Sequence, residues 1–193
     1  MATAKKTKSK PQDFYALFFA CVEKRGWFAL TLPEIARATK TPLPELLQRF
    51  PDKADILTAF GQSIDVQLAQ NVNESAEPLK DKLFDMVMRR FDALAPYRKG
   101  IVRLMDDMQA HPVSAAMLML ETLCGFHRSM ILMMEMAGIS TAHPRAMLAA
   151  MGLKIVYLSV LRTWKQDESA DLSATMAILD RGLDRLIKLL RFG

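Results

Sequence analysis

The stretch Gly26–Phe60, GWFALTLPEIARATKTPLPELLQRFPDKADILTAF, predicts two very short helices joined by a tight turn and followed by a longer helix. Thr31 is suited to cap the first short helix, because Pro33 lies in its first turn and Glu34 completes a capping-box pattern. The first short helix is therefore expected over Leu32–Ala38. Helices this short need a scaffold, since nucleation costs more than a few hydrogen bonds return. A pair of this kind is most typical of a helix-turn-helix that binds DNA.

The second short helix is expected to start at Thr41 or Pro42 and to run to about Arg49. Asp52 is then suited to cap a longer helix that continues for about five turns, to Val72. The side chains expected on the inner face of the pair are apolar: Ile35, Leu46 and Phe50.

The remaining chain also predicts helices. Hydrophobic residues make up 51% of the 193 residues, and Val, Ile and Thr form no alternating runs, so strands have little support. We predict an all-α fold of about nine helices. Five of them follow the linking helix, at residues 79–94, 97–109, 112–137, 144–165 and 172–190, with Asp171 as the cap of the last. The predicted division is a disordered basic arm (1–11), a helix-turn-helix domain with its linking helix (12–72), and a C-terminal helical domain (73–193) that begins at a polar seam.

The net charge of +5 lies mainly in the arm, where residues 1–10 hold four lysines and no acid. Residues 11–72 hold six basic and seven acidic residues, which gives 6 − 7 = −1. A lysine arm suits DNA phosphates, anionic lipid surfaces, or simply a solubilising tail.

The other compositional features favour a soluble cytoplasmic protein. Cys21 and Cys124 both occur in apolar helical stretches, which indicates reduced core thiols, with a disulfide as the alternative. No transmembrane segment is expected, because charged residues interrupt the most apolar region, Val113–Ile139.

The order of these parts resembles the TetR family of bacterial transcriptional regulators. The resemblance rests on Gly26-Trp27, on Ile35-Ala36, and on Leu46, Phe50 and Lys53, whose spacing matches the family pattern without a gap. The motif covers residues 12–60, and the rest matches by helix layout only. The resemblance implies an N-terminal three-helix DNA-binding domain and a C-terminal domain for ligand binding and dimerisation.

A TetR-type protein is expected to act as a homodimer whose second short helices lie in the major groove of a DNA operator, about one turn apart. A small hydrophobic ligand would tilt the linking helix and release the DNA. The positions expected to contact DNA come from the arm, the caps and the recognition helix: Lys8, Lys10, Thr31, Lys40, Thr41, Leu43, Pro44, Gln48, Arg49 and Lys53.

The recognition helix departs from the family pattern. Lys40 stands where the family usually has glycine, Pro42 where it has a serine or threonine cap, and Leu47 where it has a tyrosine. The outward positions also include Pro44 and Glu45. Prolines remove N–H donors, and glutamate repels phosphate, so these residues are poorly suited to hold DNA.

Two further sets of residues are expected in the C-terminal half. Methionine is flexible and polarizable, so a methionine-rich region suits an adaptable pocket, with ordinary core packing as the alternative. The expected pocket residues are Met105, Met108, Met119, Phe126, His127, Met130 and Met134. The residues expected at a dimer interface of the last two helices, with packing within one chain as the alternative, are Tyr157, Leu161, Trp164, Met176, Leu179, Leu183 and Leu186.

A second resemblance supports an alternative function. Residues 145–172, RAMLAAMGLKIVYLSVLRTWKQDESADL, are similar to the corresponding stretch of the TetR-fold lipid-binding proteins that assist ubiquinone biosynthesis. That resemblance implies isoprenoid lipid as the ligand, a helix-turn-helix that no longer binds DNA, and peripheral contact with a membrane.

Enzymatic function has little support in the sequence. It contains no glycine-rich phosphate loop, nucleophile elbow or HExxH motif. Asp106 and Asp107 are adjacent, so their side chains diverge on a helix. His111 and His143 each precede proline and indicate helix boundaries, and we expect no catalytic residue, metal site or cofactor.

Overall fold

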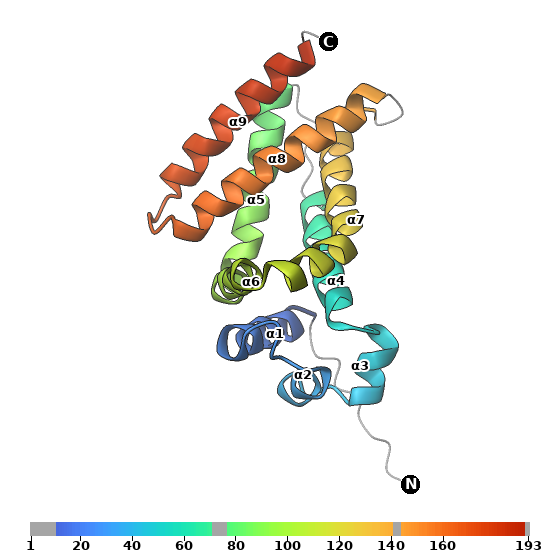
Figure 1. The fold of residues 1–193 in the computed structure, drawn as a ribbon. Helices are drawn as coiled ribbons and strands as arrows, with labels where there is room; N and C mark the ends of the chain where they lie inside the picture. The colour runs from blue at the N-terminus through green and yellow to red at the C-terminus, as the bar shows by residue number, and fades with distance from the viewer. Residues whose placement is uncertain (1–10, 71–76, 141–143, 192–193) are drawn as a thin grey trace. The chain divides into compact units, whose positions relative to one another are not determined.

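A computed structural model describes residues 11–70, 77–140 and 144–191 of the chain (Figure 1). The regular elements of these residues are all helices. The elements are α1 (Pro11–Arg25), α2 (Leu32–Ala38), α3 (Leu43–Arg49), α4 (Lys53–Ala69), α5 (Leu79–Leu94), a 3-10 turn (Ala95–Tyr97), α6 (Arg98–Ala110), α7 (Pro112–Met136), α8 (Pro144–Gln166) and α9 (Ser173–Arg191). The predicted all-α class is confirmed, and the bounds of α2 and α5 are those predicted. The predicted arm falls on residues 1–11, of which 1–10 lie outside the described residues.

The chain forms two compact units that differ from the predicted division. The N-terminal unit comprises the chain up to Ile56 together with Pro96–Ala116, and the C-terminal unit comprises Leu57–Ala95 together with the chain from Met117. The boundary therefore lies within α4, whereas the predicted seam at 73–78 falls largely outside the described residues. Helix α6, which was expected in the C-terminal domain, belongs to the N-terminal unit because it packs on α1.

The N-terminal unit is held together by close packing of α1 against α6. Gly100 makes this approach possible, since a Cβ atom there would overlap the backbone carbonyl of Phe19. Phe19 also contacts the ring of Tyr97, with the centroids 5.6 Å apart. Gly26 ends α1 with φ 79°, and its N–H donates to the carbonyl of Val22 at 2.9 Å, as expected for a glycine just past a helix.

Helices α5, α7, α8 and α9 all contribute buried side chains to the core of the C-terminal unit. Close approach of α8 and α9 depends on two glycines, because a Cβ at Gly152 would meet Leu186 and one at Gly182 would meet Val156. The rings of Phe91, Tyr157 and Trp164 are buried there, and the half-buried ring of Phe126 contacts Tyr157. The ring centroids are 5.2–5.5 Å apart in the contacting pairs.

A buried charged cluster lies in the same unit. The guanidinium of Arg90 on α5 pairs with Asp65 on α4, and the Ser129 hydroxyl on α7 donates to the second oxygen of that carboxylate. Arg90 also lies 5.7 Å from the ring centroid of Tyr157, whose pKa is raised by burial. A buried charge is tolerated only when it is paired in this way, so the cluster fixes α4, α5 and α7 to one another within the C-terminal unit.

The connection between α8 and α9 is organised by Asp167. Its carboxylate accepts hydrogen bonds from the N–H and the hydroxyl of Thr175, at 2.8 and 2.7 Å, and from the N–H of Ser169 at 3.1 Å. Asp171, the predicted cap, accepts from the N–H of Ser173 at 3.2 Å. The start of α9 therefore depends on both aspartates, and only Asp171 was predicted.

One segment of the described chain, Met147–Gln166 of α8, is long and apolar enough to pass as a candidate membrane span. The core helix of a soluble protein passes the same test, and α8 places Leu153, Val160 and Trp164 in the core described above. By itself this is weak evidence for a span.

Candidate DNA-binding face of the helix-turn-helix

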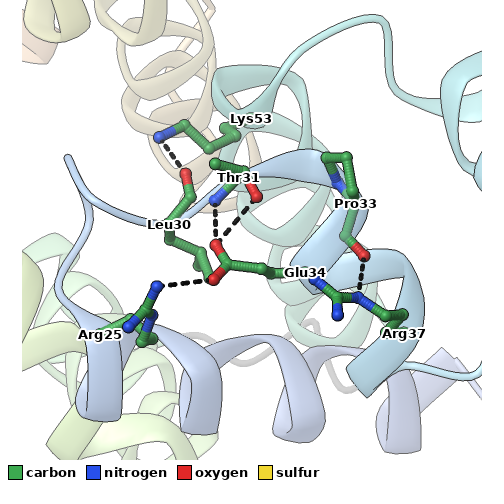
Figure 2. A network of polar contacts seen from close by, with 7 residues as sticks. All are labelled: Arg25, Leu30, Thr31, Pro33, Glu34, Arg37 and Lys53. Carbon is green, nitrogen blue, oxygen red and sulfur yellow. Dashed lines mark hydrogen bonds and ion pairs between the residues drawn. The ribbon is translucent and has the colours of Figure 1, made fainter.

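The start of α2 is fixed by a polar network around Glu34 (Figure 2). The N–H and the hydroxyl of Thr31 both donate to one Glu34 oxygen, at 2.9 and 2.8 Å, and Arg25 pairs with the other at 2.7 Å. These hydrogen bonds, that of the Thr31 hydroxyl above all, lower the pKa of Glu34. The capping box was predicted, and the half of it in which the Glu34 carboxylate accepts from the N–H of Thr31 is confirmed.

The turn between α2 and α3 is a Schellman motif. The N–H of Thr41 donates to the carbonyl of Ala36 at 3.0 Å, and the N–H of Lys40 donates to that of Arg37 at 3.3 Å. Lys40 occupies the left-handed position of this motif, with φ 53°. This conformation explains why the family usually has glycine where this chain has Lys40, because glycine adopts a positive φ without strain.

Helix α3 begins without a side-chain cap. Its N-cap residue is Pro42, and the hydroxyl of Thr41, a possible cap one residue earlier, donates instead to the carbonyl of Thr39 at 3.4 Å. Pro42 and Pro44 have no N–H to offer to a DNA phosphate. The start of α3 is therefore a poor phosphate-binding point, as its sequence indicated.

The inner face of the pair is buried as predicted, with Ile35, Leu46 and Phe50 in the core of the N-terminal unit. The outer face of α3 is exposed and presents Pro44, Glu45, Leu47, Gln48 and Arg49. Gln48 and Arg49 are the members of this face that can donate hydrogen bonds to bases or phosphates. Leu47 is 43% exposed and offers only an apolar contact.

Arg49 is positioned by aromatic rings. Its guanidinium carbon lies 4.8 Å from the ring centroid of Phe50 and 5.4 Å from that of Phe14. Stacking of this kind holds the guanidinium plane in place while leaving its N–H groups available.

The ten residues predicted to contact DNA fall into three groups: those outside the described residues, those on the surface around α3, and those bonded within the chain. Lys8 and Lys10 lie outside the described residues. Lys40, Pro44, Gln48 and Arg49 are exposed around the turn and α3, whereas Thr41 and Leu43 are half-buried. The N–H and the hydroxyl of Thr31 both donate to Glu34, and the ammonium of Lys53 donates to a backbone carbonyl of the same unit.

Lys53 is engaged with the backbone of its own unit. Its ammonium donates to the carbonyls of Trp27 and Leu30, at 2.9 and 2.6 Å, and lies 5.0 Å from the Trp27 ring centroid. Burial lowers the pKa of this ammonium. Sequence pattern alone cannot separate this use of a lysine from a phosphate contact.

The predicted ligand-pocket residues do not come together within one unit. Met105 and Met108 belong to the N-terminal unit, whereas the other five belong to the C-terminal unit. Among those five, Met130 and Met134 are fully buried and Met119 is exposed. Met130 and Met134 are therefore part of the apolar interior of the C-terminal unit, where the pocket stays a prediction.

Most of the residues predicted for a dimer interface are used for packing within the single chain. Tyr157, Trp164, Leu179, Leu183 and Leu186 are buried in the core of a single chain, and Leu161 and Met176 are half-buried. Their stripe serves the packing of α9 on α8 and α5. The apolar side chains that α8 leaves exposed are Met147, Leu148, Met151, Ile155 and Leu158.

Other residues carry structural roles that the sequence did not reveal. Asp107 on α6 accepts a hydrogen bond from the N–H of Trp27 at 2.5 Å, across 80 residues of sequence. Cys21 is half-buried, with its pKa raised by burial, and Cys124 is exposed, so only the first resembles a core thiol. Within the described ranges no group of three or more His, Cys, Asp or Glu residues could hold a metal ion.

The comparisons with known proteins bear on the fold. No family model matches the sequence, and no curated protein gives a match. Among solved structures, a TetR transcriptional regulator from Nitrosomonas europaea ATCC 19718 is similar with a TM-score of 0.67 and 20% identity, covering 93% of this chain and 99% of that one. A TetR transcriptional regulator from Rhodococcus sp. RHA1 is similar with a TM-score of 0.62 and 15% identity, covering 91% and 94%. The chain therefore has the fold of the TetR transcriptional regulators.

Proposed function

We propose that this chain is a TetR-type transcriptional regulator that binds a DNA operator through α2 and α3. The observation that carries this proposal is the completeness of the helix-turn-helix. Its turn is closed by backbone hydrogen bonds, its inner face is buried, and the outer face of α3 is left to solvent with Gln48 and Arg49 on it. A short helix held in this way is suited to enter a major groove.

The regulator acts as a homodimer through the outward face of α8. Met147, Leu148, Met151 and Ile155 recur at helical spacing and are exposed, with Ile155 at 69%. Contiguous exposed apolar side chains mark an interaction surface. A two-fold dimer buries the same face of both copies and presents two copies of α3 to two half-sites.

A small hydrophobic ligand releases the protein from DNA, which makes it a repressor that responds to a signal. The support is the apolar C-terminal unit, rich in buried methionine and aromatic side chains, which suits an apolar ligand better than a charged one. Helix α4 contributes residues to both units, so a shift of α4 is the proposed route from ligand to DNA.

A second candidate function is lipid binding by a TetR fold that has lost DNA recognition, assisting ubiquinone or isoprenoid metabolism. It is favoured by the outer face of α3, where prolines, Glu45 and Leu47 replace groups that hold DNA. The exposed apolar side chains of α8 also suit contact with lipid.

One experiment separates the two candidates. The purified protein is titrated against DNA from upstream of its own gene in an electrophoretic shift, and an organic extract of the same preparation is analysed for lipid. If the protein is a regulator, we expect a specific, salt-sensitive shift. Lys40 is exposed, so Lys40→Glu should abolish this shift if the turn faces phosphate in the complex. Absence of specific binding together with a co-purified isoprenoid lipid would support the second candidate and reject the first.

A further inference from the structure

Both backbone polar groups of Trp27 are bonded to charged side chains from distant helices. The N–H of Trp27 donates to Asp107 of α6 at 2.5 Å, and its carbonyl accepts from Lys53 of α4 at 2.9 Å. These partners are 80 and 26 residues away in the sequence. The indole is buried and makes an edge contact with Phe18, with the centroids 6.4 Å apart. Trp27 is thus held through its N–H, its carbonyl and its ring.

The Lys53 side of this arrangement uses most of what an ammonium can donate. Two of its three N–H groups have acceptors, the carbonyls of Trp27 and Leu30, and Figure 2 shows the bond to Leu30 beside the capped start of α2. The ammonium also lies over the indole of Trp27. Leaving these acceptors to reach a phosphate would unpair two partly buried carbonyls, which costs more than an exposed ion pair returns.

The carboxylate of Asp107 is also bonded to a residue of its own helix, α6. Arg103 donates to the second oxygen of Asp107 at 3.0 Å, and the Asp107 side chain is only 13% exposed. A charged acceptor with a fixed partner makes a stronger hydrogen bond to a backbone N–H than a neutral acceptor does.

The position of Trp27 determines what these bonds control. Leu30 directly precedes Thr31, the cap of α2, and α2 is joined to α3 by the backbone bonds of the Schellman turn. The connection from Trp27 to α3 therefore consists of a short capped helix and a closed turn. A displacement of the Trp27 backbone is therefore expected to displace α3 as well.

We infer that Lys53 and Asp107 clamp the backbone of Trp27 from both sides and thereby position the α2–α3 pair, so that Lys53 supports DNA binding through the backbone without touching phosphate. This inference deepens the proposed function and rests on it for its DNA readout. It makes Asp107 a positioning residue as well, although its negative charge on its own opposes DNA binding.

The first test measures the salt dependence of DNA affinity by fluorescence anisotropy, using Lys53→Met, Asp107→Ala and the exposed control Lys40→Ala. Lys53→Met keeps the apolar stem and should weaken binding about tenfold at every salt concentration, with an unchanged slope of log affinity against log salt. Lys40→Ala, which removes a cation outside the clamp, should reduce that slope by about one. A slope reduced by about one in Lys53→Met would overturn the inference, because it would show a phosphate contact.

Asp107→Ala separates positioning from charge. Removal of an acid strengthens DNA binding on electrostatic grounds alone, so a loss of affinity of about tenfold is expected only if the clamp matters. Asp107→Asn keeps an acceptor oxygen and should recover part of the loss. Affinity equal to or above wild type in Asp107→Ala would contradict the inference.

The second test needs no DNA and therefore decides the inference even if the protein binds none. Amide hydrogen exchange is measured for peptides covering residues 26–49 in full-length wild type, Lys53→Met and Asp107→Ala, with α9 peptides as the internal reference. Faster exchange in 26–49, with α9 unchanged, is the expected result. Unchanged exchange in α2 and α3 would overturn the clamp, and loss of wild-type DNA binding alone would reject only the proposed function.

Discussion

At the scale of single residues, Lys40 shows how the helix-turn-helix departs from ideal chemistry. It holds a left-handed conformation, with φ 53°, at the end of α2. An L-residue there costs about 1–2 kcal/mol, whereas glycine loses about 0.5–1 kcal/mol in chain entropy. We expect Lys40→Gly to raise the free energy of unfolding by about 0.5–1 kcal/mol, measured by urea denaturation.

The matched control for this prediction is Lys40→Ala. Alanine removes the same charge and side chain but keeps the Cβ atom, so no gain in stability is expected. Equal stability of the glycine and alanine variants would show that the turn is not strained at this position.

Asp167 provides a prediction about pH. Hydrogen bonds from the Ser169 hydroxyl and from the hydroxyl and N–H of Thr175 hold its pKa well below the ordinary value of 3.8. In the unfolded chain the carboxylate takes up a proton at higher pH, so its contribution to stability is complete above about pH 5 and is lost as the pH falls below about 4. We expect Asp167→Asn to be less stable than wild type at pH 7 and the difference to shrink towards pH 3.

Urea denaturation at pH 7, 5, 4 and 3 measures this difference. Glu168→Gln, the same change of charge at an exposed neighbouring residue, should stay close to wild type throughout. A constant difference between Asp167→Asn and wild type from pH 7 to pH 3 would mean that the carboxylate does not act through these hydrogen bonds.

At the scale of the helices, α8 carries apolar side chains on two faces with different partners. One face packs in the chain's own core through Leu153, Val160 and Trp164, and the outward face holds Met151 and Ile155. We expect Ile155→Glu to convert the proposed dimer to a monomer, because a buried unpaired carboxylate at the interface is costly. Sedimentation equilibrium measures the molecular mass.

Gln62→Glu is the control for this experiment, since Gln62 is exposed on α4 and the change adds the same charge to another helix. It should leave the mass unchanged, and the circular dichroism of both variants should match wild type. A dimer that persists in Ile155→Glu would place the interface elsewhere.

The helices also show what the sequence could predict and where it failed. The bounds of α2 were predictable because Thr31, Pro33 and Glu34 act within one turn. The outward face of α8 was not, since Ile155 and Tyr157 are both apolar and periodicity does not say which face a partner chain covers.

The bond between Asp107 and Trp27 joins residues 80 positions apart, so no local pattern reveals it. The inward turn of Lys53 was missed for the same reason, because lysine at that spacing also suits a phosphate contact.

At the scale of the whole molecule, the distribution of charge limits how DNA could be held. The net charge is +5, with four lysines in residues 1–10, whereas residues 11–72 sum to −1. Arg49 on α3 and Lys40 in the turn are exposed cations of the helix-turn-helix, and Lys53 is occupied within it. We therefore expect specific binding to depend on a well-positioned α3, with the N-terminal lysines as a less specific source of affinity.

A competition titration measures whether the helix-turn-helix of this chain binds DNA specifically, as we propose. The full-length protein is titrated against labelled DNA from upstream of its own gene, at two salt concentrations, with unlabelled upstream or unrelated DNA as competitor. We expect a preference for the upstream DNA of about a thousandfold or more, with affinity falling steeply as salt rises. Equal competition by unrelated DNA, or no binding at the lower salt concentration, would contradict it.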